Sequence, residues 1–198
     1  ITHTGSAANL SVDMSRSGSA STLGLNADYS WIAGGTVTVT NLLNTDNVIL
    51  DPTWEGAGFP SAFQNLVLRT ASNTVNDIVD LELDRQNTGG DGTGNLTIDA
   101  LTVLAGSAPS AGIVEHLNIH SNGDDIGINI VTNIDNVNAA GIAIDGDNDL
   151  IFGSAASGYA VAGGSIDGSA ATGDLTLFLG GNGSQQAAGG TGDDTIVL

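Results

Sequence analysis

The sequence predicts an all-β protein, with a parallel β-solenoid or β-roll in its second half and a less regular β-rich first half. Three observations favour this fold class. Short runs with apolar residues at alternate positions recur along the chain, which is typical of half-buried strands. Turn-forming residues separate these runs, among them 29 glycines. No window of about ten residues or more repeats near the helical period of about 3.6, so we expect no long helix.

The expected strands begin roughly 10 to 20 residues apart, a spacing that suits either a sandwich or the rungs of a solenoid. They cover residues 9–15, 35–41, 47–51, 65–69, 79–85, 95–99, 116–121, 127–131, 141–145, 149–153, 174–180 and 194–198. A solenoid rung needs only a short strand and a tight turn, because each rung buries its apolar residues on its neighbours. The very short strands and small residues after position 95 therefore favour the solenoid in that half.

The composition changes between the two halves of the chain. "LDPTWEGAGFPSAFQNL" holds two of the three prolines, so residues 51–65 are expected to be an inserted loop or one short helix. After about residue 95 proline almost disappears, and the turns become rich in Gly-Asp and Asn-Gly. We therefore expect a β-rich N-terminal region over residues 1–90. Residues 91–198 are expected to form a β-solenoid that leads into calcium-binding repeats.

The charge balance excludes several classes of partner. The chain has 22 acids against only three arginines and no lysine, for a formal net charge of -19. Such a field repels phosphate backbones and anionic lipid, so we expect no nucleic-acid partner. No apolar run approaches the roughly 18 residues that a membrane span needs, so we expect no membrane insertion.

The acids are mostly aspartates, since glutamate occurs only as Glu55, Glu82 and Glu115. Aspartate among Gly and Asn serves both tight turns and oxygen-donor cation sites. Turn chemistry and solubility account for about half of these aspartates. Cysteine is absent, so disulfides and thiolate metal sites are excluded, and bound divalent cations are the expected additional source of stability.

The C-terminal stretch "GGTGDDTIV", residues 189–197, fits the nonapeptide G-G-x-G-x-D-x-U-x at every specified position. The glycines allow a turn whose carbonyls point at a hard cation, and carboxylates complete an oxygen shell for Ca²⁺. The expected metal-binding residues are Gly190, Gly192, Asp193 and Asp194. Ile196 is expected to face the interior of the following strand.

Two further stretches resemble this nonapeptide. "GGNGSQQAA", residues 180–188, keeps all three glycines but has Gln185 at the aspartate position. "GGDGTGNLT", residues 89–97, has Gly94 there. With a single intact repeat, we expect the ligands that complete its site to come from residues beyond 198 or from another chain. The chain begins with Ile1 and ends inside the motif, so we also expect it to be a section of a longer polypeptide.

A second calcium site is expected in "DGDND", where Asp145, Asp147 and Asp149 alternate beside a glycine. An EF-hand is excluded, because the position that would need glutamate is Ala156. A plain Asx-rich turn is the competing interpretation of these three aspartates.

Other candidate positions carry weaker patterns. Asp124 and Asp125 repeat the Gly-Asp-Asp turn and are further candidate metal ligands. His116 and His120 share one strand face; we interpret them as an exposed polar face rather than a zinc site. The threonines of "TVTVT", residues 36–40, are interpreted as strand formers because no threonine ladder follows in the sequence.

The stretch "GGTGDDTIVL" resembles the repeat of RTX proteins, the hemolysin-type calcium-binding family of secreted bacterial proteins. Residues 114–181 are similar to the solenoid before such repeats in RTX-type surface-layer proteins and adhesins, with "VEHLNI" and "IDGSAATGDL" as matching rungs. The likeness covers roughly residues 95–198 and is specific over the last twenty. It implies one-step type I export, an extracellular calcium-rich setting and a structural or adhesive role. The chain departs from the family in having one intact repeat and no terminal secretion signal.

We therefore expect a secreted, structural, calcium-dependent subunit of an extracellular bacterial assembly, such as an S-layer lattice or a filament. Its expected partners are copies of itself and cell-surface polysaccharide. The alternatives are a domain of a secreted RTX adhesin that binds glycans or surfaces, and a region linked to a secreted enzyme. We expect no enzyme activity: the chain has no Cys, no Lys and no G-x-S-x-G, and no aspartate pair stands out as a glycosidase pair.

Overall fold

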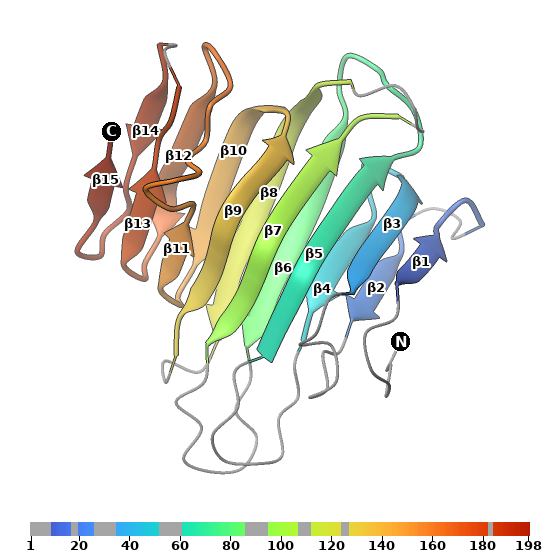
Figure 1. The fold of residues 1–198 in the computed structure, drawn as a ribbon, viewed down its shortest axis with the longest axis horizontal. Coiled ribbons are helices and arrows are strands. Elements are labelled where there is room, and N and C mark those ends of the chain that lie inside the picture. Colours follow the sequence, from blue (N-terminus) through green and yellow to red (C-terminus); the bar gives the residue numbers. More distant parts are fainter. Residues whose placement is uncertain are drawn as a thin grey trace.

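The computed structural model describes residues 9–16, 20–25, 35–51, 61–85, 95–106, 112–123, 127–181 and 184–198. Within these ranges the chain forms fifteen strands and no helix, so the predicted all-β class is confirmed. The strands wind into a parallel β-solenoid of two facing sheets (Figure 1). Colours run from blue at the N-terminal end of the solenoid to red at its C-terminal end, because each coil stacks on the one before it.

The odd-numbered strands form one sheet and the even-numbered strands form the other. The odd sheet contains β1 (Leu10–Asp13), β3 (Thr36–Leu42), β5 (Ser61–Thr70), β7 (Leu96–Leu104), β9 (Asn129–Val137), β11 (Leu150–Phe152), β13 (Leu175–Phe178) and β15 (Thr195–Val197). The even sheet contains β2 (Thr22–Leu25), β4 (Asn47–Leu50), β6 (Ile78–Arg85), β8 (Val114–Gly123), β10 (Ala139–Gly146), β12 (Ser165–Ala171) and β14 (Gln186–Ala188). Each coil contributes one strand to each sheet, which is why all neighbouring strands run parallel.

The coils become shorter from the middle of the solenoid toward the C-terminus. Asn65 on β5 pairs with Ala100 on β7, a separation of 35 residues (100 minus 65). Thr176 on β13 pairs with Thr195 on β15, only 19 residues away (195 minus 176). The last coils also have the shorter strands, since β13 has four residues and β14 and β15 have three each.

The core fills the space between the two sheets. Residues at alternate positions of each strand point inward and form columns across the stacked coils. One column of the odd sheet is fully buried and consists of Phe63, Ile98, Val131, Phe152 and Leu177. Ile196 continues this inward column, as the sequence indicates, but stays 41% exposed because no further strand pairs with β15.

The two sheets continue across the expected boundary near residue 90, since β5 pairs with β7 and β6 pairs with β8. β5 begins at Ser61, so the loop expected over 51–65 gives way to a strand there, while residues 52–60 lie outside the described ranges. Every expected alternating run coincides with a strand, and β12 overlaps the stretch "IDGSAATGDL" that was matched as a rung, but β2 and β14 were not expected. No helix in the described residues is long and apolar enough to cross a membrane.

Candidate metal centre

Three consecutive turns stack on one edge of the solenoid, each leading from an even strand to the next odd strand. We call residues 147–149, 172–174 and 189–194 the acidic turn stack. Backbone hydrogen bonds hold the turns together: the Thr172 N–H donates to Gly146 O (2.8 Å), and the Thr191 N–H donates to Ala171 O (3.1 Å). The turns of successive coils are therefore in direct contact.

Glycine is required in this stack mainly because the backbones approach closely. A Cβ on Gly190 would lie 2.1 Å from Ala171 O, and one on Gly192 would lie 2.7 Å from Gly173 O. Neither residue has a positive φ, so the motif glycines serve close approach of the backbones rather than a left-handed turn. Gly146 differs, because it combines a φ of 110° with a Cβ position 2.1 Å from Ser121 O.

Aspartates on the stacked turns form a column of carboxylates. Leu150 pairs with Leu175, and Thr176 pairs with Thr195, so Asp149, Asp174 and Asp193 occupy equivalent positions in three coils. Neighbouring coils lie about 4.8 Å apart, and like charges directly opposite each other are destabilising.

Two carboxylates of this column, and that of Asp194, accept backbone hydrogen bonds from a neighbouring coil. The Asp174 N–H donates to Asp149 Oδ1 (2.8 Å), and the Asp193 N–H donates to Asp174 Oδ1 (2.7 Å). In the opposite direction along the stack, the Leu175 N–H donates to Asp194 Oδ1 (2.9 Å). These bonds fix the carboxylates at the edge of the solenoid.

The donor set of the acidic turn stack consists of oxygen atoms, which suits a hard cation such as Ca²⁺. Among the described residues, no three His, Cys, Asp or Glu side chains converge on one point. A cation bound here would therefore take carboxylates from adjacent turns and fill its shell with backbone carbonyls and water.

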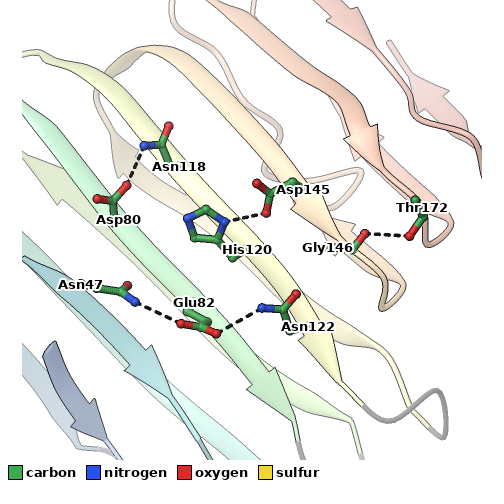
Figure 2. A network of polar contacts seen from close by, with 9 residues as sticks. All are labelled: Asn47, Asp80, Glu82, Asn118, His120, Asn122, Asp145, Gly146 and Thr172. Carbon is green, nitrogen blue, oxygen red and sulfur yellow. Dashed lines mark hydrogen bonds and ion pairs between the residues drawn. The ribbon is translucent and has the colours of Figure 1, made fainter.

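The structure distributes the predicted site residues over three places. Those in the acidic turn stack are Gly190, Gly192, Asp147, Asp149, Asp193 and Asp194. Asp145 lies on the outer face of β10 instead, with Oδ1 2.5 Å from His120 Nδ1 on β8 (Figure 2). Asp124 and Asp125 lie outside the described residues. The sequence interpretation missed Asp174, which precedes the alternating run of β13 just as Asp149 precedes that of β11.

The second, incomplete nonapeptide, residues 180–188, follows β13 and ends with β14. There the Gln185 side chain lies between two backbone carbonyl groups. Gln185 Nε2 donates to Gly180 O (2.7 Å) and to Tyr159 O (2.9 Å). The glutamine amide thus gives these carbonyls a partner from within the chain.

A ladder of polar side chains crosses the outer face of the even sheet (Figure 2). Glu82 on β6 accepts from Asn47 Nδ2 on β4 (3.0 Å) and from Asn122 Nδ2 on β8 (3.1 Å). Asn118 Nδ2 donates to Asp80 Oδ1 (2.6 Å). Asp80, Glu82 and Asp145 are thus bridged to neighbouring coils by amides and by His120.

Local contacts shift the pKa of two carboxyl groups near this face. Burial raises the pKa of Asp51, and the negative charges of Asp84 and Glu82 raise it further. Hydrogen bonds from the Ser169 side chain and backbone lower the pKa of Asp167. The even sheet thus combines one carboxyl group that resists ionisation with another that ionises readily.

Comparison of the chain with protein-family models, curated proteins and solved structures finds no match to any of them. The similarity to RTX repeats therefore rests on the residues of the C-terminal motif and of the rungs before it.

Proposed function

We propose that this chain is a secreted, structural, calcium-dependent subunit of an extracellular bacterial assembly, such as an S-layer or a related lattice or filament. The observation that carries this proposal is the column formed by Asp149, Asp174 and Asp193 on stacked turns. A cation offsets the repulsion within such a column, and it binds the folded coil more tightly than the unfolded chain. RTX-type export is part of the proposal and rests on the motif resemblance.

A solenoid suits a structural role because it exposes long regular faces and derives its stability from coil stacking. The chain has no cysteine, so cations on the turns are the cross-links available to a domain that folds outside the cell. Copies of the chain are the proposed partners, because cations lower the self-repulsion of a protein with a formal charge of -19.

Calcium-dependent unfolding tests this proposal. We expect the melting temperature of the purified chain to rise on moving from chelator to millimolar calcium, and magnesium at equal concentration to have a smaller effect. Electron microscopy in calcium should then show sheets or filaments. Identical melting curves in chelator and calcium would exclude the calcium-dependent function.

The second candidate is a domain of a secreted adhesin that binds glycans or surfaces, including cell-surface polysaccharide. It is favoured by a groove of about 320 Å³ on the edge opposite the acidic turn stack, lined by Ile134, Val137, Asn138, Ala160 and Val161 among others. A glycan-array screen with dispersed, monomeric particles in calcium would support the adhesin over the lattice subunit.

A further inference from the structure

The two outer faces of the solenoid carry very different charge. The even sheet presents five outward-pointing acids, and none of its described outward side chains is Lys or Arg. These acids are Asp80, Glu82, Asp84, Asp145 and Asp167. On the odd sheet, the charged side chains among the described outward residues are Asp13, Arg69 and Asp99, so two carboxylates and one guanidinium leave a formal charge of -1.

The odd face is covered by short side chains in regular columns. One column runs across β1, β3, β5 and β7 and consists of Ser11, Thr38, Val67 and Thr102. Another runs from β7 to β15 and consists of Thr97, Ile130, Ile151, Thr176 and Thr195. Valine and isoleucine interrupt the threonines, so the face is a mixed apolar and hydroxyl surface rather than a threonine ladder. Side chains of this kind lose little rotamer freedom when they are covered.

The odd face is large enough for a stable protein contact. Its eight strands lie about 4.8 Å apart and average about six residues of about 3.3 Å each, which gives roughly 800 Å². A typical stable interface buries about 800 Å² on each partner.

We propose that the outer face of the odd sheet is the surface through which two copies of this chain pair. The two faces would meet about a two-fold axis, as in a sandwich of two sheets. This inference rests on the self-assembly in the proposed function but not on a calcium site in the acidic turn stack, and calcium is expected to strengthen the pairing only by lowering the repulsion between the chains.

The charge asymmetry favours a second copy over a polysaccharide as the partner. Two chains that each carry -19 repel each other, and this repulsion is weaker between odd faces than between even faces, because the described outward side chains of the odd face carry less net charge. A neutral glycan meets no such barrier on either face, so a glycan partner would not account for the difference between them.

Matched aspartate substitutions on the two faces test the pairing. Ile151→Asp places a charge on the odd face at β11, and Ala143→Asp places the same charge on the even face at β10. Both sites are outward positions of strands that are paired on both sides. Thr176→Asp on β13 is the second odd-face variant if Ile151→Asp does not fold.

Analytical ultracentrifugation gives the mass of each protein in chelator and in calcium, and circular dichroism checks its fold. We expect wild type and Ala143→Asp to dimerise, and the odd-face variant to dimerise at least about tenfold more weakly, because pairing of the odd faces would bury the added charge of each copy without a partner of opposite charge. A monomeric wild type, or equal dimerisation of both variants, would overturn the inference. Binding of a monomeric wild type to insoluble polysaccharide, lost in Ile151→Asp, would assign the face to a glycan and also overturn it. Dimers that form without any effect of calcium on melting would support the pairing and exclude calcium dependence.

Discussion

Replacing Asp174 by asparagine tests whether the acidic turn stack is built around a cation. The change keeps an oxygen that accepts the Asp193 N–H (2.7 Å in the wild type) and removes one negative charge. Asp149 and Asp193 flank Asp174 at the coil spacing of about 4.8 Å, at which each pair of like charges repels by about 0.9 kcal/mol in a water-like dielectric. Losing both repulsions gains about 1.7 kcal/mol, while the weaker hydrogen bond to a neutral acceptor costs about 1 kcal/mol. Without a cation, Asp174→Asn should therefore be as stable as wild type or slightly more stable.

Calcium should reverse this order, because the carboxylate then becomes a ligand and the variant binds the ion more weakly. The assay is urea unfolding of both proteins at low salt, first with chelator and then with millimolar calcium. Sodium chloride of equal ionic strength controls for general screening of the column. A variant that is less stable than wild type by the same amount in both conditions would refute the reasoning. Asp174 would then serve only as a backbone acceptor.

Three further changes test other parts of the molecule. Gly146→Ala should destabilise the fold by at least about 3 kcal/mol in urea, because its φ is 110° and its Cβ would lie 2.1 Å from Ser121 O. Gly24→Ala, with nothing within 4 Å of the added Cβ, should have no such effect, and equal losses in the two variants would contradict this reasoning. Burial raises the pKa of Tyr159 from 10.0 to about 12, which favours the neutral phenol in the folded state. Stability should therefore fall as pH rises from about 10 to 12, a fall that melting curves should show in wild type but not in Tyr159→Phe. Gln185→Asp replaces an amide that donates to the Tyr159 carbonyl with a carboxylate. This variant should be less stable than wild type in chelator, and calorimetry should show additional bound calcium. An unchanged number of bound calcium ions would argue against this prediction.

The strands that could be predicted from the sequence are those with a clear period of two. In β3, Val37 and Val39 are buried and alternate with partly exposed threonines, which is the pattern that the sequence analysis used. β12 lacks this alternation, because Ile166 is its only large apolar residue, and only the resemblance to a solenoid rung indicated it. It is a strand because β10 and β14 pair with it on both sides, and such pairing between coils is not visible in the local pattern.

The sequence could predict the candidate ligands within a single turn, but not the ligands that a neighbouring turn places beside them. The motif identified Asp193 and Asp194, but it gave no indication that Asp174 lies beside them, because that contact depends on how the coils are stacked. Alternation alone groups Asp145 with Asp147 and Asp149. β10 ends at Gly146, however, so the chain turns between these aspartates and leaves Asp145 on the sheet face against His120.

The short strands of the last coils explain why acceptor side chains gather on their turns. The coil from Thr176 to Thr195 has strands of only three or four residues, so many of its N–H groups lie outside the ladders and need other acceptors. The carboxylates of Asp149 and Asp174 supply these acceptors to the next turn along the stack. Each acceptor of this kind also adds a negative charge next to the previous one, at a spacing set by the sheet itself. Asparagine would satisfy the same N–H groups without this repulsion, so backbone hydrogen bonding alone does not account for aspartate at these positions. The preference for the charged residue in the shortest coils is what a cation shared between turns would require.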